Sequence, residues 1–301
     1  MNMERSGVLL IDKPEGITSH DVVGKVRRLY NTRRVGHTGT LAPMATGLLV
    51  ILIGRAAKAA EYLTGKNKSY RAVLRLGITT DTEDVTGQIL DTSRDIPSKE
   101  QVIDVAESFK GEILQTPPMY SALKVGGQKL VDLARRGVEI ERKPRPITIH
   151  SLSCEPLENG DYSLDVTCSA GTYIRTLCAD IGKKLGCGGA MAALRRTETG
   201  EFSLADSQTL EQLETMDEEA RYSLLMPIEA LFGDLPAVKL PAFYEKLCRS
   251  GCEIYQKKIG VTLPLEARVR LCDAKGQFFA LGEVREYTDG LAIKPLKQFD
   301  I

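Results

Sequence analysis

The fold of this chain is decided around residues 35–50, which read Val35-Gly36-His37-Thr38-Gly39-Thr40-Leu41-Ala42-Pro43-Met44-Ala45-Thr46-Gly47-Leu48-Leu49-Val50. Glycine permits a left-handed backbone and the close approach of a ligand, and Pro43 favours an extended conformation at Ala42. Residues 48–53 are all apolar. The pattern therefore predicts a tight polar loop that leads into a buried strand, a common place for functional groups. The centre of this loop nevertheless has no carboxylate, thiol or lysine.

The segments around this loop predict an α+β fold. Residues 68–76 alternate, with Tyr70, Ala72 and Leu74 on one side, which is typical of a half-buried strand. Further strands are predicted at residues 7–11 and 162–168. Helices are predicted at residues 21–30, with Thr18 or Ser19 as the cap, and at residues 56–63, 101–110 and 174–185.

Length and composition are those of a soluble protein with two domains. The chain has 301 residues, of which 43% are apolar and 27% are charged. A linker at residues 232–236 divides a domain at 1–233 from a β-rich one at 234–301. In the smaller domain we expect a helix at residues 242–249 and strands at residues 261–272, 277–284 and 291–296.

Charge is balanced over the whole chain but not along it. The net charge is zero, yet residues 124–145 are basic and residues 206–219 are acidic. A local basic surface suits RNA, although two solvated faces would give the same pattern. Residues 115–146, which contain Pro117-Pro118, are read as a basic excursion from the core.

No segment indicates a membrane, a metal or secretion. The longest apolar run is too short for a bilayer, and the first six residues lack the layout of a signal peptide, so we expect a cytoplasmic protein. The seven cysteines form no C-x-x-C pair and the chain has only three histidines. Reduced structural thiols are therefore expected rather than a zinc site.

Six short motifs follow one another along residues 7–200. They are Asp12-Lys13-Pro14-x-Gly16, the segment from Val35 to Gly47, Lys68-Ser69-Tyr70, the segment from Pro117 to Lys124, the segment from Gly171 to Leu177, and Leu194-Arg195-Arg196-Thr197. In this order they resemble the TruB family of pseudouridine synthases, which modify the T-loop uridine at tRNA position 55. The family carries its nucleophilic aspartate where this chain has Ala42; Thr38 and Met44 are smaller departures, from glycine and leucine.

The resemblance implies a fold and a partner. The fold is a mixed, largely antiparallel sheet flanked by helices and loops. By position, residues 234–301 look like the family's PUA-like RNA-binding domain, and residues 115–146 like its RNA-binding thumb. The implied partner is the T-arm stem-loop of tRNA, bound by a monomer that needs no cofactor and no metal.

The resemblance also implies roles for single residues. Position 42, Tyr70 and Arg175 are the implied catalytic group, with Tyr70 stacked on the flipped base and Arg175 paired with the family's carboxylate. The implied substrate contacts are His37, Tyr173, Leu194, Lys13, Lys124, Lys129 and Arg142. His37 would fill the gap left by the flipped nucleotide. Core packing is the alternative for Tyr70, Tyr173 and Leu194, a loop cap for His37, and loop support or an exposed turn for Lys13.

Alanine at position 42 leaves three interpretations. A carboxylate can attack or stabilise an electron-poor sugar carbon, whereas a methyl group cannot. The first interpretation is a tRNA pseudouridine synthase whose nucleophile has been replaced, so that it binds tRNA without turnover. The second is a natural non-catalytic tRNA-binding or tRNA-folding factor of the same descent. In the third, a different carboxylate, Asp81, Asp84 or Asp180, takes the role.

Overall fold

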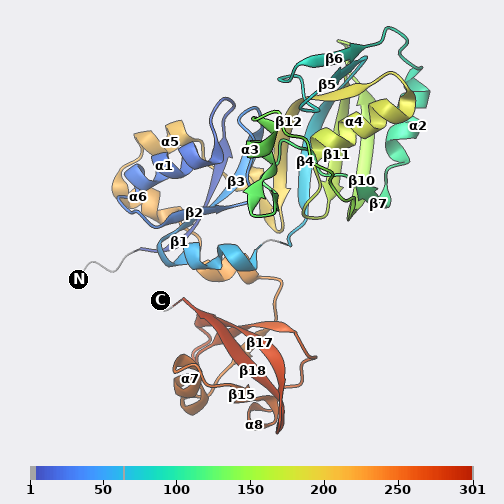
Figure 1. Cartoon of the computed structure of the whole chain (residues 1–301). Helices are drawn as coiled ribbons and strands as arrows, with labels where there is room; N and C mark the ends of the chain where they lie inside the picture. Colours follow the sequence, from blue (N-terminus) through green and yellow to red (C-terminus); the bar gives the residue numbers. More distant parts are fainter. Residues whose placement is uncertain (1–4, 64, 300–301) are drawn as a thin grey trace.

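The computed structural model describes residues 5–63 and 65–299. Figure 1 shows two parts: a large twisted sheet with helices and loops around it, and a smaller β-rich part below. No helix among the described residues is both long and apolar enough to cross a membrane.

The large sheet has the strand order β1-β3-β12-β4-β11-β10-β7, with β2 and β13 paired at its side. All its pairings are antiparallel except the one between β12 and β3, as expected for a mixed, largely antiparallel sheet. The strands are β1 (Gly7–Lys13), β2 (Val35–Thr38), β3 (Thr46–Ile53), β4 (Lys68–Leu76), β7 (Gly111–Gln115), β10 (Arg145–Pro156), β11 (Tyr162–Cys168), β12 (Gly189–Thr199) and β13 (Phe202–Ser203).

Helices cover the sheet in two groups. At one end, α1 (Ser19–Leu29) and α5 (Leu210–Thr215) pack with β1 and β3 around a core that includes Val22, Val26 and Leu213. At the other end, α2 (Lys99–Glu107) and α4 (Ile174–Leu185) lie on β10 and β12. The remaining short elements are η1 (Gly54–Tyr62), the ribbon of β5 (Ile78–Thr80) and β6 (Ile89–Thr92), η2 (Leu204–Asp206), α6 (Glu218–Ser223) and η3 (Ile228–Phe232).

The first helix begins where its cap places it. Thr18 accepts a hydrogen bond from the backbone N–H of Asp21, and the Asp21 carboxylate accepts one from the Thr18 N–H. This reciprocal capping satisfies two N–H groups that a helix end leaves without partners. The helix therefore starts at Ser19, two residues before the predicted start.

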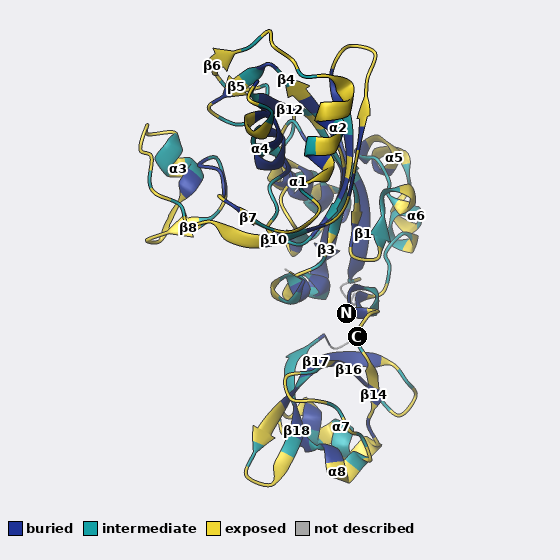
Figure 2. Ribbon diagram, turned by 90° about the vertical axis from the view of Figure 1, so that its right-hand side faces the viewer, coloured by how far each residue is buried: buried dark blue, intermediate teal, exposed yellow. Residues whose placement is uncertain are grey.

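Residues 116–144 leave the sheet between β7 and β10, inside the predicted range of 115–146, because Gln115, Arg145 and Pro146 still pair within the sheet. They form a hairpin of β8 (Lys124–Val125) and β9 (Gln128–Lys129) and the short helix α3 (Leu130–Ala134). Figure 2 shows this insertion projecting to one side of the sheet with a largely exposed surface.

The C-terminal part is a five-stranded sheet in the order β14-β16-β17-β18-β15. Its elements are β14 (Ala237–Lys239), α7 (Ala242–Arg249), β15 (Ile254–Tyr255), α8 (Gln256–Ile259), β16 (Arg268–Cys272), β17 (Phe278–Tyr287) and β18 (Gly290–Gln298). The predicted strand over residues 261–267 is wrong, because this segment contains Pro264 and ends beside Glu266 with a positive φ. Both parts share a core in which the rings of Phe232, Phe278 and Phe299 lie 5.5–5.9 Å apart.

Candidate active site

The loop that carries Ala42 joins β2 to β3 and is held by the turn that follows β1. The Ser19 hydroxyl accepts from the Leu41 N–H at 2.9 Å and lies 3.2 Å from the Leu41 carbonyl. The Gly16 N–H donates to the Pro43 carbonyl at 2.9 Å. The two residues that flank Ala42 are therefore fixed from outside the loop, and Ala42 itself is half-buried.

Lys13, at the end of β1, also holds the loop that carries Ala42. Its side chain is 0% exposed, and its ammonium donates to the carbonyls of Pro14, Ile17 and Pro43 at 2.8, 2.7 and 3.3 Å. Burial lowers the pKa of Lys13. An ammonium that gives its three hydrogens to three carbonyls has none left for a phosphate. These contacts favour the alternative in which Lys13 supports the loop, and a contact of Lys13 with substrate stays a prediction.

Four of the six motifs meet in one row across the sheet. Lys13 pairs with Gly47, Gly47 with Arg196, Arg196 with Tyr70, and Tyr70 with Val166. Residues that lie opposite each other on neighbouring strands point to the same face. Motifs that are far apart in sequence thus place their side chains side by side.

Tyr70 lies on β4 at the edge of the core and is 9% exposed. Burial raises the pKa of its phenol, while the positive charge of the neighbouring Arg196 acts in the opposite direction. Met44, from the loop, packs against the same core. Tyr70 is therefore both a core residue and a neighbour of the loop.

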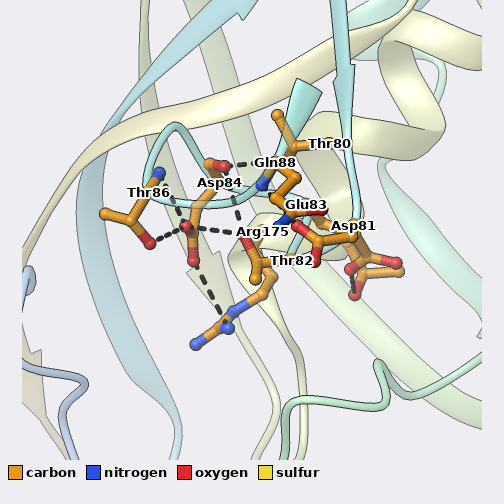
Figure 3. A network of polar contacts seen from close by, with 9 residues as sticks. Thr80, Asp81, Thr82, Glu83, Asp84, Thr86, Gln88 and Arg175 are labelled. Carbon is orange, nitrogen blue, oxygen red and sulfur yellow. Dashed lines mark hydrogen bonds and ion pairs between the residues drawn. The ribbon is translucent and has the colours of Figure 1, made fainter. Parts of the chain in front are cut away.

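Arg175 occupies the first turn of α4. The N-terminal end of a helix carries a partial positive charge, which disfavours a cation there. An ion pair with Asp84 offsets this, with 3.4 Å between Arg175 Nη1 and Asp84 Oδ2 (Figure 3). Asp84 is 3% exposed, and it also accepts from the hydroxyls of Thr82 and Thr86. In this chain, which lacks a carboxylate at position 42, Asp84 is the ion-pair partner of Arg175.

The three aspartates considered as replacement nucleophiles lie on other elements. The carboxylate of Asp84 is taken up by the contacts just described, and that of Asp81 accepts the Gln88 N–H at 2.7 Å. Asp180 lines a cavity of about 710 Å³ between the insertion, the β5–β6 ribbon and α4, together with Glu83. Burial raises the pKa of both Glu83 and Asp180. None of the three belongs to the loop, so the structure gives the third interpretation no support.

The remaining predicted pocket residues come from three elements. His37 lies on β2, half-buried; burial lowers the pKa of its imidazole, and its Nδ1 has no hydrogen-bond partner among the described residues. Tyr173 is the N-cap of α4, where the buried Gln115 amide donates to its carbonyl and accepts its N–H at 3.0 and 2.8 Å. Leu194 lies on β12, half-buried against the core that contains Tyr70. Each side chain is partly accessible from outside.

The predicted RNA contacts of the insertion fall into two groups. Lys124 and Lys129 are exposed and face each other across the hairpin. Arg142, in contrast, donates to the Pro117 carbonyl at 3.1 Å and to Glu139 at 3.0 Å. Arg142 therefore serves first to close the insertion on itself.

A second basic surface was not identified from the sequence. Arg33, Arg34, Arg55 and Lys58 line a hollow of about 510 Å³ at the junction of β2 and η1. In the sequence, Arg33 and Arg34 form one basic pair, and Arg55 and Lys58 form another. The two pairs come together only because β2 pairs with β3, so the sequence alone does not reveal a shared basic surface. The hollow adds a concentration of positive charge outside the insertion.

Other supporting residues were also missed. Arg195 pairs with Asp12 at 2.6 Å and donates to the Thr46 hydroxyl at 3.3 Å. Arg196 and Gln115 had been placed in motifs or strands without a role. Both are buried and polar, and a polar residue at a position predicted to be buried is the signal that could have singled them out. Among the described residues, no three histidine, cysteine or carboxylate side chains gather as a metal site would require.

Comparison with known proteins agrees with this geometry. Residues 27–174 match the model described as TruB family pseudouridylate synthase (N terminal domain), and residues 175–233 match that of the tRNA pseudouridylate synthase B C-terminal domain. The tRNA pseudouridine synthase B of Dechloromonas aromatica (strain RCB) is 45% identical over 92% of this chain and 91% of its own length. That of Clostridium kluyveri (strain ATCC 8527 / DSM 555 / NBRC 12016 / NCIMB 10680 / K1) is 50% identical over 82% and 85%.

Solved structures give the same answer for the fold. The crystal structure of a Cbf5-Nop10-Gar1 complex contains a chain with a TM-score of 0.76 and 27% identity, covering 98% of this chain and 85% of that one. These matches include the C-terminal part, which the two family models leave out. The chain therefore belongs to the TruB family of pseudouridine synthases.

Proposed function

We propose that this chain is a synthase for pseudouridine 55 of tRNA that, with Ala42, binds the T-arm stem-loop as a monomer without turning it over. The observation that carries the proposal is the loop of residues 39–45. Side chains and backbone of the preceding turn hold it in place, while its central residue presents only a methyl group. Such a protein would act in the cytoplasm, where tRNA is found.

The reaction explains why one residue decides activity. Pseudouridylation breaks the bond between uracil N1 and the sugar, turns the base, and joins C5 to the same sugar carbon, with loss of the C5 hydrogen. A carboxylate at position 42 can attack or stabilise the electron-poor sugar carbon, as carboxylates do in glycosidases. Tyr70 would stack on the flipped base, and Arg175, held by Asp84, would face the reacting carboxylate.

Binding needs none of that chemistry. Lys124 and Lys129 on the insertion, together with the hollow around Lys58, supply positive charge to phosphates. His37 would fill the space of the flipped nucleotide, and Tyr173 and Leu194 would contact the base. The PUA-like domain at residues 234–301 is proposed to hold a further part of the RNA. Binding of this kind weakens as salt rises.

The test restores the carboxylate. Ala42→Asp is incubated with a T-arm stem-loop carrying tritium at uridine C5, and tritium release is measured. We expect Ala42→Asp to exceed the unchanged chain at least 1000-fold, a large step because the chemical group itself is supplied, and Ala42→Asn, of the same shape, to stay at background. A stem-loop with cytidine at position 55 should release nothing with any variant.

The outcomes separate the two remaining interpretations. If Ala42→Asp binds the stem-loop but releases no tritium, the chain is a non-catalytic tRNA-binding factor. If neither form binds the stem-loop more tightly than a scrambled RNA of equal length, the T-arm assignment is wrong.

A further inference from the structure

Arg196 is the most deeply buried cation of the site that the proposed mechanism leaves unused. Its side chain is 1% exposed, and within the described residues it has no carboxylate partner. Burying an unpaired charge is costly, so such a residue is retained only where its hydrogen bonds do work that an apolar side chain cannot. The arrangement of those bonds shows what that work is.

The guanidinium binds the loop at both ends. Its Nε donates to the Leu48 carbonyl at 2.7 Å and its Nη2 donates to the Gly39 carbonyl at 3.0 Å. Gly39 precedes Ala42, and Leu48 follows it at the start of the buried strand. One side chain thus joins both ends of the loop to β12, through charge-assisted bonds that are stronger than neutral ones.

The same guanidinium lies beside Tyr70. Arg196 is opposite Tyr70 in the pairing of β12 with β4, and the two side chains interact electrostatically. Arg196 therefore links the loop segment to the strand that carries the phenol. His37 and Lys68 also lie within its electrostatic reach.

Close strand packing makes this possible. Gly47, with φ +98°, lies opposite Arg196, and a Cβ there would come within 2.3 Å of the Arg196 carbonyl oxygen. Only glycine allows β3 to approach β12 so closely. The planar guanidinium then places its Nε and Nη2 donors far enough apart to reach carbonyls of two separate segments.

We propose that Arg196 is a positioning residue, which keeps the loop of residue 42 and the hydroxyl of Tyr70 in one fixed relation. The part of this proposal that concerns rate rests on the proposed function. The part that concerns the loop does not, because it is a statement about the folded chain alone.

The first experiment uses the full chain as it stands. Amide hydrogen exchange is compared for Arg196→Lys and for Arg71→Lys, which alters an exposed arginine of β4 that pairs with Asp165. In Arg196→Lys we expect the amides of Leu41 and Ala45 to exchange at least 10-fold faster, with less than 2-fold change in β10 and β11. Unchanged loop amides, or equal acceleration everywhere, would overturn the proposal.

A second variant keeps the arginine in case Arg196→Lys does not fold. Tyr70→Phe removes only the hydroxyl, which interacts electrostatically with Arg196. If the phenol and the loop are coupled through Arg196, the amides of Leu41 and Ala45 exchange about 3-fold faster in this variant. No change there means that the two are independent, and the proposal fails.

The second experiment measures the reaction in the Ala42→Asp background. Adding Arg196→Lys should lower the single-turnover rate at least 30-fold with stem-loop affinity within 3-fold, whereas adding Arg71→Lys should change the rate by less than 3-fold. With Tyr70→Phe also present, the loss caused by Arg196→Lys should shrink, because coupled residues are not additive. Full additivity contradicts the proposal. If Ala42→Asp itself is inactive, the proposed function fails, and the exchange data still decide the role of Arg196.

Discussion

Lys13 and Lys124 are both lysines beside glycine-containing turns of the same domain, yet their surroundings are opposite. Lys13 is buried and donates to three carbonyls, while Lys124 is exposed on a hairpin whose facing residue, Lys129, is another cation. The first lysine is part of a fixed support for the loop of residue 42. The second lies where like charges are tolerated only because water surrounds them.

The comparison separates two tasks. The loop is held by buried, satisfied hydrogen bonds, which is how a site keeps reacting groups in place. The insertion of residues 115–146 is largely exposed, and the exposed Lys124 and Lys129 can meet phosphates, which suits RNA recognised by shape. Rigidity and charge are thus assigned to different segments of one domain.

Replacing Lys13 should show the largest effect on stability. Lys13→Met leaves buried carbonyls without a donor, which costs about 1–3 kcal/mol for an unsatisfied group. We expect the free energy of unfolding in urea to fall by about 2–3 kcal/mol. Lys124→Met is the matched control and should stay within about 0.5 kcal/mol, as exposed substitutions do. Equal effects of the two variants would erase the contrast between the regions.

Reversing charge on the insertion should leave stability alone and weaken RNA binding. For the pair Lys124→Glu and Lys129→Glu we expect the affinity for the T-arm stem-loop to fall about 10-fold or more at 0.1 M salt. The slope of log affinity against log salt should become shallower by about one for each phosphate that the variant no longer neutralises. Lys99→Glu, at the exposed start of α2, is the control. An unchanged slope would mean that the insertion does not contact phosphate.

Local features of the fold could be predicted from the sequence because their causes are local. The capping of α1 by Thr18 depends on Asp21, three positions away. The alternation of buried and exposed residues along β4 depends on residues two positions apart. The end of α4 was predicted at Gly186, which adopts φ +79° as a helix-terminating glycine does.

The function of Arg196 could not be predicted, because its partners Leu48 and Gly39 are 148 and 157 residues away. Lys13 was read as a turn residue, whereas β1 continues through it and buries it. Arg142 was predicted to contact RNA with the other cations of the insertion, but it forms an ion pair with Glu139, three residues earlier. Sequence patterns identified which residues matter more readily than what each side chain contacts.

The smallest expected effect concerns pH and again contrasts the two regions. Burial lowers the pKa of His37 in the folded chain below its usual value. Below that usual value the unfolded chain therefore binds a proton that the folded chain does not, so His37 makes stability rise with pH until the unfolded pKa is passed.

Glu83, beneath the insertion, has the opposite sign. Burial raises the pKa of its carboxyl, so the folded chain holds a proton that the unfolded chain has lost, and stability falls as pH rises through this range. In urea unfolding from pH 4 to pH 8, His37→Gln should flatten the rise that ends near pH 6.5, and Glu83→Gln should remove a fall that begins near pH 4.5. Because the two contributions oppose each other, the unchanged chain should show less pH dependence than either variant. If the unfolding free energies of His37→Gln and Glu83→Gln depend on pH in the same way, burial does not shift the pKa values of these two side chains in opposite directions.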